Sequence, residues 1–215
     1  MAKTYNELTR VQLPAVLHLV KMGYKYFSYK QNKQYIDPET NIFVSEFRKQ
    51  FLKLNPEAVN SDFEKEFKDI KLELGYNDLG RSFFNRIQGT SNSNYKFVDW
   101  ENFSNNSFKI AIEVPCINGE EEFRPDITVF INGFPLSYIE VKQPNAIRDK
   151  TTGMKSEFNR MTVRFKNQKF RKFHNITQLI CFSDNMPYAD DEGQQLQGSY
   201  YATTSLGKAI FNSMH

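Results

Sequence analysis

The sequence predicts an α/β domain with a mixed central sheet flanked by helices. In the first third of the chain, apolar residues recur at helical spacing behind two candidate capping boxes. From residue 108 onward they alternate with polar residues, which is typical of strands, and a helical segment then precedes a further strand. Helices followed by three strands, a helix and a strand indicate a mixed sheet. The 215 residues are enough for one such domain.

The first predicted helix lies at the start of the chain. Thr4 and Glu7 have the spacing of a capping box, and apolar residues follow at helical intervals. Pro14 should kink or divide this helix, because proline lacks an N–H and clashes with the preceding turn. Gly23 is a natural end for it.

Two further helices are predicted before the strands, and one after them. The first covers residues 43–54 and places its apolar residues on one face. The next begins at a Ser61-x-x-Glu64 capping box, ends at Gly75 and carries lysines and acids on its other faces. The last is predicted over residues 154–172.

The strands are predicted from alternating apolar residues and from the turns between them. Asn118-Gly119 and Asn132-Gly133 mark turns, since these pairs tolerate positive φ. The predicted strands cover residues 108–114, 127–131, 136–141, 177–182 and, as a short edge strand, 200–203.

Composition limits the function classes. Charged residues make up 25% and the net charge is +3, which permits a nucleic-acid partner without requiring one. The two cysteines, Cys116 and Cys181, lie in apolar runs, as buried thiols of a reducing compartment do. There is no signal peptide and no apolar run near the ~20 residues that span a membrane. We therefore expect a soluble, cytoplasmic protein.

Three charged residues stand at the ends of two neighbouring predicted strands. Asp126 follows Pro125 at the start of one strand, and Glu140 and Lys142 end the next. The spacing alone fits two interpretations. The residues form a functional site, or Glu140 and Lys142 form a solvated surface ion pair that stabilises the fold little.

The register of the two strands decides whether these three residues meet. A tight two-residue turn at Asn132-Gly133 sends Asp126 and Glu140 to opposite faces. A bulged or three-residue turn, with Gly133 left-handed, shifts the pairing by one residue and gathers the acids and Lys142 on one face. The apolar residues of both strands then share the other face, so burial favours the bulged register.

Two carboxylates and an ammonium group on one face suit metal-dependent phosphodiester hydrolysis. The phosphate is anionic and the alkoxide leaves poorly, and a divalent ion with hard oxygen ligands relieves both difficulties. We expect Asp126 and Glu140 to hold Mg²⁺, together with the main-chain carbonyl of Val141. Lys142 would orient the attacking water or offset charge on the phosphate.

A longer motif contains these residues. The chain reads RPDI-x-x-F-x-NG-x-PL-x-x-IE-x-K from Arg124 to Lys142. This run resembles the PD-(D/E)xK nuclease superfamily, specifically the N-terminal nuclease domain of the restriction (R) subunit of type I restriction-modification enzymes. The resemblance covers most of the chain and implies a restriction-endonuclease-like fold. It further implies a Mg²⁺-dependent endonuclease that cuts double-stranded DNA beside methylation and specificity subunits, with Asp126 and Glu140 as metal ligands and Lys142 as catalytic lysine.

The resemblance also bears on residues outside this motif. Many members place a glutamate in the first helix near the metal, and Glu7 occupies such a position, which its capping box explains equally well. A Gln-x-x-x-Tyr motif of the family is replaced by Arg160 and by Arg164 or Phe165. The basic helix that carries Arg160 and Arg164 is interpreted either as a solvated surface or as a contact to the DNA backbone.

A phosphate-binding loop of the form G-x-x-x-x-G-K-[ST] does not occur in the 215 residues. We therefore interpret residues 1–215 as a single endonuclease domain, either the N-terminal fragment of a longer subunit whose ATP-dependent motor lies elsewhere or a stand-alone relative, and favour the fragment. ATP would be bound only by that full-length subunit. The alternatives are an inactive DNA-binding or assembly domain of the same fold, and a repair nuclease that acts on branched DNA.

Overall fold

A mixed β-sheet forms the centre of the computed structural model, which describes residues 11–91, 93–141, 160–161, 163–164, 166–183, 199–202 and 212–213. Within these residues the sheet has seven strands in the order β1-β2-β5-β6-β7-β8-β9. The strands are β1 (Lys25–Tyr26), β2 (Phe108–Ile112), β5 (Ile127–Ile131), β6 (Phe134–Val141), β7 (Leu179–Ser183), β8 (Ser199–Ala202) and β9 (Asn212–Ser213). The pairs β1–β2 and β6–β7 are parallel and the other neighbours are antiparallel. The predicted α/β class with a mixed sheet is confirmed.

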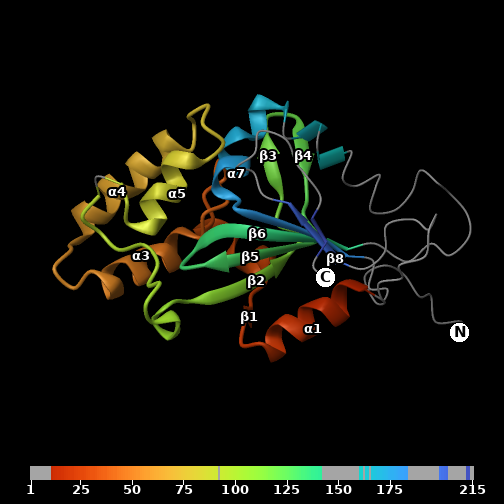
Figure 1. Cartoon of the computed structure of the whole chain (residues 1–215), viewed down its shortest axis with the longest axis horizontal. Coiled ribbons are helices and arrows are strands. Elements are labelled where there is room, and N and C mark those ends of the chain that lie inside the picture. Colours follow the sequence, from red (N-terminus) through yellow and green to blue (C-terminus); the bar gives the residue numbers. More distant parts are fainter. Residues whose placement is uncertain are drawn as a thin grey trace, which may run out of the picture.

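Helices and a small hairpin surround this sheet. The helices are α1 (Leu13–Lys21), α2 (Tyr29–Asn32), α3 (Val44–Leu54), α4 (Asn60–Glu73), α5 (Arg81–Gln88) and α7 (Arg171–Ile176), with 3-10 turns η2 (Lys33–Tyr35), η3 (Phe103–Asn105) and η4 (Gln168–Phe170). Strands β3 (Cys116–Asn118) and β4 (Glu121–Phe123) pair with each other. Figure 1 shows α1 below the sheet, α7 and the β3–β4 hairpin above it, and α3, α4 and α5 gathered at one end. The candidate site, described below, lies at the opposite end of β5 and β6.

Phenylalanines fill the core between α3, α4, α5 and the sheet. Phe47 lies at its centre, with ring centroids of Phe63 and Phe134 at 5.0 and 4.4 Å. The fully buried rings of this cluster are Phe47, Phe51, Phe63, Phe83, Phe97 and Phe134. Aromatic pairs at these separations add about 0.5–1.5 kcal/mol each beyond the burial of their area. This core holds the turn between β5 and β6 in place.

The turn between β5 and β6 is a two-residue connection. Ile131 pairs with Phe134, and the intervening Asn132 and Gly133 have φ of 51° and 88°, which suits a tight hairpin turn. The start of α3 lies directly against it, because Phe43 N donates to Gly133 O at 2.8 Å. A Cβ at position 133 would come within 2.6 Å of Phe43 O, so only glycine fits.

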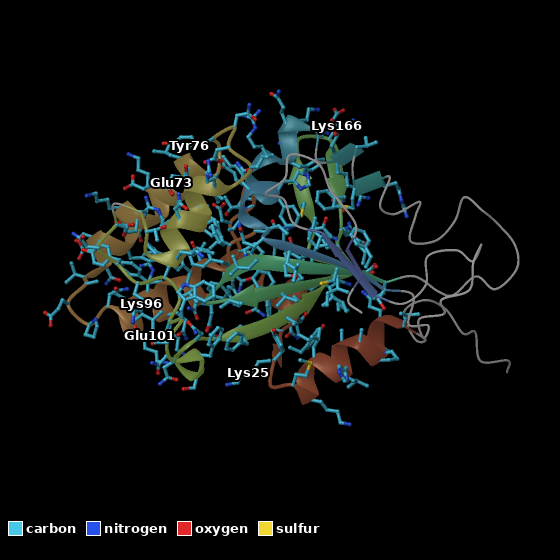
Figure 2. The ribbon with its side chains drawn as sticks, in the orientation of Figure 1. Lys25, Glu73, Tyr76, Lys96, Glu101 and Lys166 are labelled. Carbon is cyan, nitrogen blue, oxygen red and sulfur yellow. The ribbon has the colours of Figure 1, made fainter. Side chains whose placement is uncertain are left out.

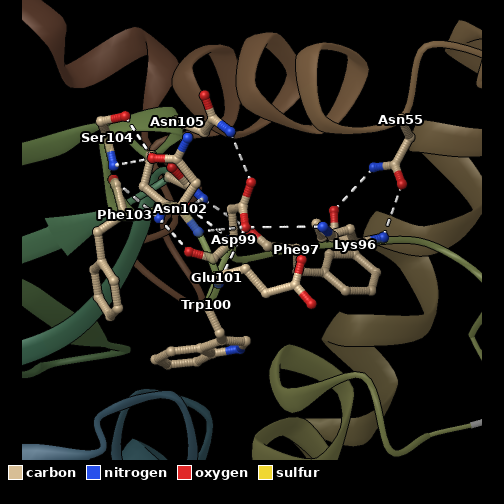
Figure 3. A network of polar contacts seen from close by, with 12 residues as sticks. Asn55, Lys96, Phe97, Asp99, Trp100, Glu101, Asn102, Phe103, Ser104 and Asn105 are labelled. Atoms are coloured by element: carbon tan, nitrogen blue, oxygen red, sulfur yellow. Dashed lines mark hydrogen bonds and ion pairs between the residues drawn. The ribbon is translucent and has the colours of Figure 1, made fainter.

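Asn132 connects the turn to the segment before β2. Its side chain is fully buried, donating to Phe97 O at 2.9 Å and to Asn106 Oδ1 at 2.8 Å, and accepting from Ser107 N at 2.7 Å. Figure 3 shows the adjoining polar contacts, in which Asp99 organises residues 96–106. The Asn-Gly pair therefore joins the β5–β6 turn to the start of α3 and to the segment before β2.

A β-bulge interrupts the pairing immediately after this turn. Phe130 pairs with Pro135, but Val129 pairs with Ser137, so Leu136 is the extra residue in β6. Pro135 has no N–H to give to a ladder, and bulges are where central strands accommodate proline. The bulge shifts the register of everything beyond it by one residue.

The predicted capping box at Ser61 and Glu64 is wrong. Helix α4 begins at Asn60, and the Asp62 carboxylate accepts a hydrogen bond from Val59 N at 2.9 Å. The helix starts two residues earlier than expected, with Val59 and not Ser61 as the capping residue, because Asp62 reaches back to the entering chain as the third residue of a capping box does. Glu64 instead forms an ion pair with Arg48 at 2.5 Å.

Two further expectations need correction. The helix predicted over residues 154–172 does not continue to its expected end, because Asn167 adopts ψ 106° and caps η4, after which α7 begins. The strand predicted over residues 200–203 is not an edge strand, since β8 pairs with β7 and with β9. Along the part of the chain that the structure describes, no helix has the length and apolar character to cross a membrane.

Candidate active site

The register of β5 and β6 brings Asp126 and Glu140 to neighbouring positions at the end of the two strands. Ile127 pairs with Ile139 as the last pair of the ladder, and the two acids flank this pair, with Asp126 just before β5. Ile127 and Ile139 face α1, while Tyr138 packs with the cluster that includes α7, so alternation places Glu140 on the α7 side. The predicted register is confirmed, although the bulge that produces it lies at Leu136 and not in the turn.

The two carboxylates have different surroundings. Glu140 is only 4% exposed, whereas Asp126 is half-buried and its Oδ2 accepts a hydrogen bond from Val141 N at 2.8 Å. Glu140 lies close enough to the buried Cys116 to influence it. Burial raises the pKa of the Cys116 thiol well above its usual range, Arg164 lowers this pKa, and Glu140 raises it further. Glu140 and Arg164 therefore both act on the side of the sheet that carries Cys116.

The main chain of Asp126 is held from two sides. Its carbonyl oxygen accepts from the side-chain amide of Gln12 at 2.8 Å and from Glu113 N at 3.2 Å. Gln12 immediately precedes α1, which begins at Leu13 with Pro14 in its first turn. Residues 11 and 12 are π-helical, and the helix type changes to α at Leu13. This change lies beside Pro14, where the sequence predicted a kink or division of the first helix.

Two of the predicted site residues, Lys142 and Glu7, lie outside the described residues, and their roles stay predictions. Among the residues that the structure does describe, no three histidine, cysteine, aspartate or glutamate side chains form a metal-binding group. The pair formed by Asp126 and Glu140 nevertheless fits Mg²⁺, which prefers carboxylate oxygens and usually keeps several waters.

The two arginines proposed for DNA contact differ in their surroundings. Arg160 is exposed and helical. Arg164 is half-buried, with its guanidinium 4.7 Å from the centre of the Phe123 ring and Nη1 3.4 Å from Met161 Sδ. Figure 2 shows Lys166, the next exposed cation of this segment, on the outside of the molecule. Of the two arginines, Arg160 presents its charge to solvent more fully.

His174 should make the protein's stability fall on acidification. Its ring is almost fully buried, Nε2 lies 3.0 Å from Arg164 O, and burial is the main cause that lowers its pKa from 6.5 to about 4. In the unfolded chain His174 is protonated below its ordinary pKa of about 6.5, whereas in the folded chain it is protonated only below about pH 4. Between these two pH values the unfolded state binds one more proton, so the free energy of unfolding falls progressively as the pH falls. The expected loss is about 3 kcal/mol, measured from urea unfolding between pH 7 and 4.

His18 provides the matched control, because it is exposed on α1. His174→Gln should flatten the dependence of the unfolding free energy on pH between 6.5 and 4, whereas His18→Gln should leave it unchanged. An equal slope in wild type and His174→Gln would show that His174 does not cause the acid sensitivity.

Sequence reasoning missed Gln12. A lone glutamine in an amphipathic segment matches no motif, and its contact with Asp126 spans 114 positions. The only local signal was Pro14, which marked a change in the helix near it.

Comparisons with known proteins place the chain among type I restriction enzyme subunits. A family model described as type I restriction enzyme R protein N terminus matches residues 4–197. The chain is 25% identical over 209 residues to the putative type I restriction enzyme MjaIXP endonuclease subunit of Methanocaldococcus jannaschii, an alignment covering 86% of this chain and 19% of that protein. It is 31% identical over 120 residues to the type I restriction enzyme HindI endonuclease subunit of Haemophilus influenzae, covering 48% and 11% respectively.

The chain spans a fifth or less of the length of these curated relatives, at 19% and 11%. The family match, in contrast, extends over nearly all of this chain and includes both strands of the candidate site. The chain therefore belongs to the family of type I restriction enzyme R protein N termini.

Proposed function

We propose that this chain is the endonuclease domain of a type I restriction R subunit and hydrolyses phosphodiester bonds of double-stranded DNA with Mg²⁺. The observation that supports this most directly is the register of β5 and β6, in which Ile127 pairs with Ile139 and the acids Asp126 and Glu140 flank that pair. Membership of the R protein N-terminal family supports it independently. A restriction-endonuclease-like fold is part of the same proposal.

The surrounding assembly is also proposed. The relatives are named endonuclease subunits and are five or more times longer than the matched segment, at 19% coverage or less. We propose that this domain works in the cytoplasm within a longer subunit that binds ATP elsewhere, beside methylation and specificity subunits. Arg160, which is exposed, is retained as the proposed contact to the DNA backbone.

Each residue of the site has a distinct proposed task. Asp126 and Glu140 would hold Mg²⁺, with the carbonyl of Val141 as a further ligand. When bound, the ion would supply a positive charge that polarises the scissile phosphate and favours deprotonation of the attacking water. Lys142 would orient that water or offset charge on the phosphate. Val141 N already fixes the Asp126 carboxylate at 2.8 Å, so part of the site is arranged before a ligand arrives.

Metal titration tests this assignment. Calorimetry should show Mn²⁺ or Mg²⁺ binding to the chain, and Asp126→Asn should weaken it by more than about 100-fold, because a charged ligand is lost. Glu101 is an exposed acid on the loop before η3, away from this site. Glu101→Gln is therefore the control and should bind metal as wild type does.

The outcome also separates the alternatives. An inactive DNA-binding or assembly domain would show no metal binding that depends on Asp126, which would contradict the proposal. A repair nuclease would bind metal but would cut branched DNA in preference to linear duplex. Comparing the two substrates at equal Mg²⁺ distinguishes it from a restriction nuclease.

A further inference from the structure

Gln12 is a buried polar residue that contacts the candidate site through its amide. Its side chain is 4% exposed, and Nε2 donates to Asp126 O at 2.8 Å. It lies where the π-helical residues 11–12 meet α1. π-Helical turns within helices occur frequently at functional sites, so both the contact and its location point to the site.

The attachment of α1 to the sheet does not explain this amide. Val16 already anchors α1 in an apolar cluster with Ile110, Ile127 and Val129. An apolar residue at position 12 would extend that cluster, whereas burying an amide is unfavourable unless its hydrogen bonds are made. The glutamine at position 12 is therefore explained by the hydrogen bond that its amide makes to Asp126 O.

The contact lies where the sheet holds Asp126 least firmly. Strand β5 begins at Ile127, so Asp126 precedes the regular ladder. Its carbonyl accepts one main-chain bond, from Glu113 N, and that bond is 3.2 Å long. Glu113 itself has φ 50°, which ends the regular course of β2. The shorter bond from Gln12 is thus the firmer restraint on this carbonyl.

We propose that Gln12 is a positioning residue for the metal site, acting through the main chain of Asp126. Val141 N holds the carboxylate of Asp126 at 2.8 Å and Gln12 holds its carbonyl at 2.8 Å, so both ends of the residue are fixed. Residues that orient metal ligands in this way are typically worth 10–100-fold in metal affinity. The inference rests on the proposed function, because it takes Asp126 as a ligand.

The test is Mn²⁺ calorimetry on the 215-residue chain. Gln12→Met keeps the length of the side chain and removes the donor, and should weaken Mn²⁺ binding by about tenfold. Gln12→Glu places an acceptor against the Asp126 carbonyl and should weaken it further. The matched control is Gln178→Met, since Gln178 Nε2 also donates to main-chain carbonyls, of Asn175 and Ile176, at the end of β7 remote from Glu140.

Thermal unfolding in EDTA is measured for the same variants to separate a positioning role from a general loss of stability. A positioning role predicts that Gln12→Met binds Mn²⁺ more weakly than a control variant with the same unfolding midpoint. Gln178→Met should bind Mn²⁺ within about twofold of wild type even if its unfolding midpoint falls as far as that of Gln12→Met. Equal weakening in both variants would overturn the inference, as would wild-type affinity in Gln12→Met alongside lost binding in Asp126→Asn. Wild-type affinity in Asp126→Asn would instead refute the proposed function itself.

Discussion

Replacing Glu140 with glutamine should lower the rate of Mg²⁺-dependent DNA cleavage by at least about 10³-fold, or about 4 kcal/mol of transition-state stabilisation. Glu140 is 4% exposed and follows Ile139, the last residue of β6 that pairs with β5. If it holds the metal as proposed, an amide at this position replaces a charged oxygen ligand with a neutral one. Asp126→Asn and Lys142→Ala should cause losses of the same order. The measurement is linearisation of a plasmid carrying a target site by the assembled complex.

The fold should survive Glu140→Gln. Glutamine has nearly the same size and shape as glutamate, and it removes a charge whose burial at 4% exposure carries a desolvation cost. The unfolding midpoint in EDTA should therefore equal or exceed that of wild type, as is common where function and stability compete. Glu101→Gln should cleave normally. Full cleavage by Glu140→Gln would contradict the assignment of this residue as a ligand.

The strands and the register of the site could be predicted because both follow from simple alternation. Ile127, Val129 and Ile139 had to share a buried face, and that requirement alone brings Asp126 and Glu140 to the other side. The position of the extra residue could not be predicted in the same way. Both the tight turn and the shifted register are real, and the bulge beside Pro135 reconciles them.

Helix α5 was missed because its buried face is not apolar throughout. Phe83 and Ile87 are buried, but Arg86 on the same face is buried as well, at 7% exposed. A charged residue at a core position removes the periodic signal on which sequence reasoning depends. Only the three-dimensional structure shows which acids form ion pairs with Arg86. The same holds for Gln12, whose partner is distant in the sequence.

Arg86 joins α4 and α5 through a buried ion network. Its Nε and Nη2 donate to the two oxygens of Glu73 at 2.8 and 2.5 Å, and its Nη1 contacts Glu66. The guanidinium Cζ also lies 5.7 Å from the centre of the Phe97 ring. Figure 2 shows Glu73 near the outer end of α4, where the two helices meet. The network is thus part of the structure that closes the phenylalanine core.

Arg86→Met should destabilise the protein by about 3–5 kcal/mol, because it leaves the buried Glu66 and the half-buried Glu73 without their cation. The measurement is urea unfolding at neutral pH.

Arg48 supplies the matched control for this prediction. It forms an ion pair with Glu64 at 2.5 Å, but the two side chains are 42% and 57% exposed. Water screens an exposed pair, so Arg48→Met should cost less than about 1 kcal/mol. Both variants remove an arginine that pairs with glutamate and lies near a phenylalanine ring, but Arg86 is buried and has two glutamate partners, whereas Arg48 is exposed and has one. Equal losses in the two variants would show that the missing cation, and not its burial, determines the cost.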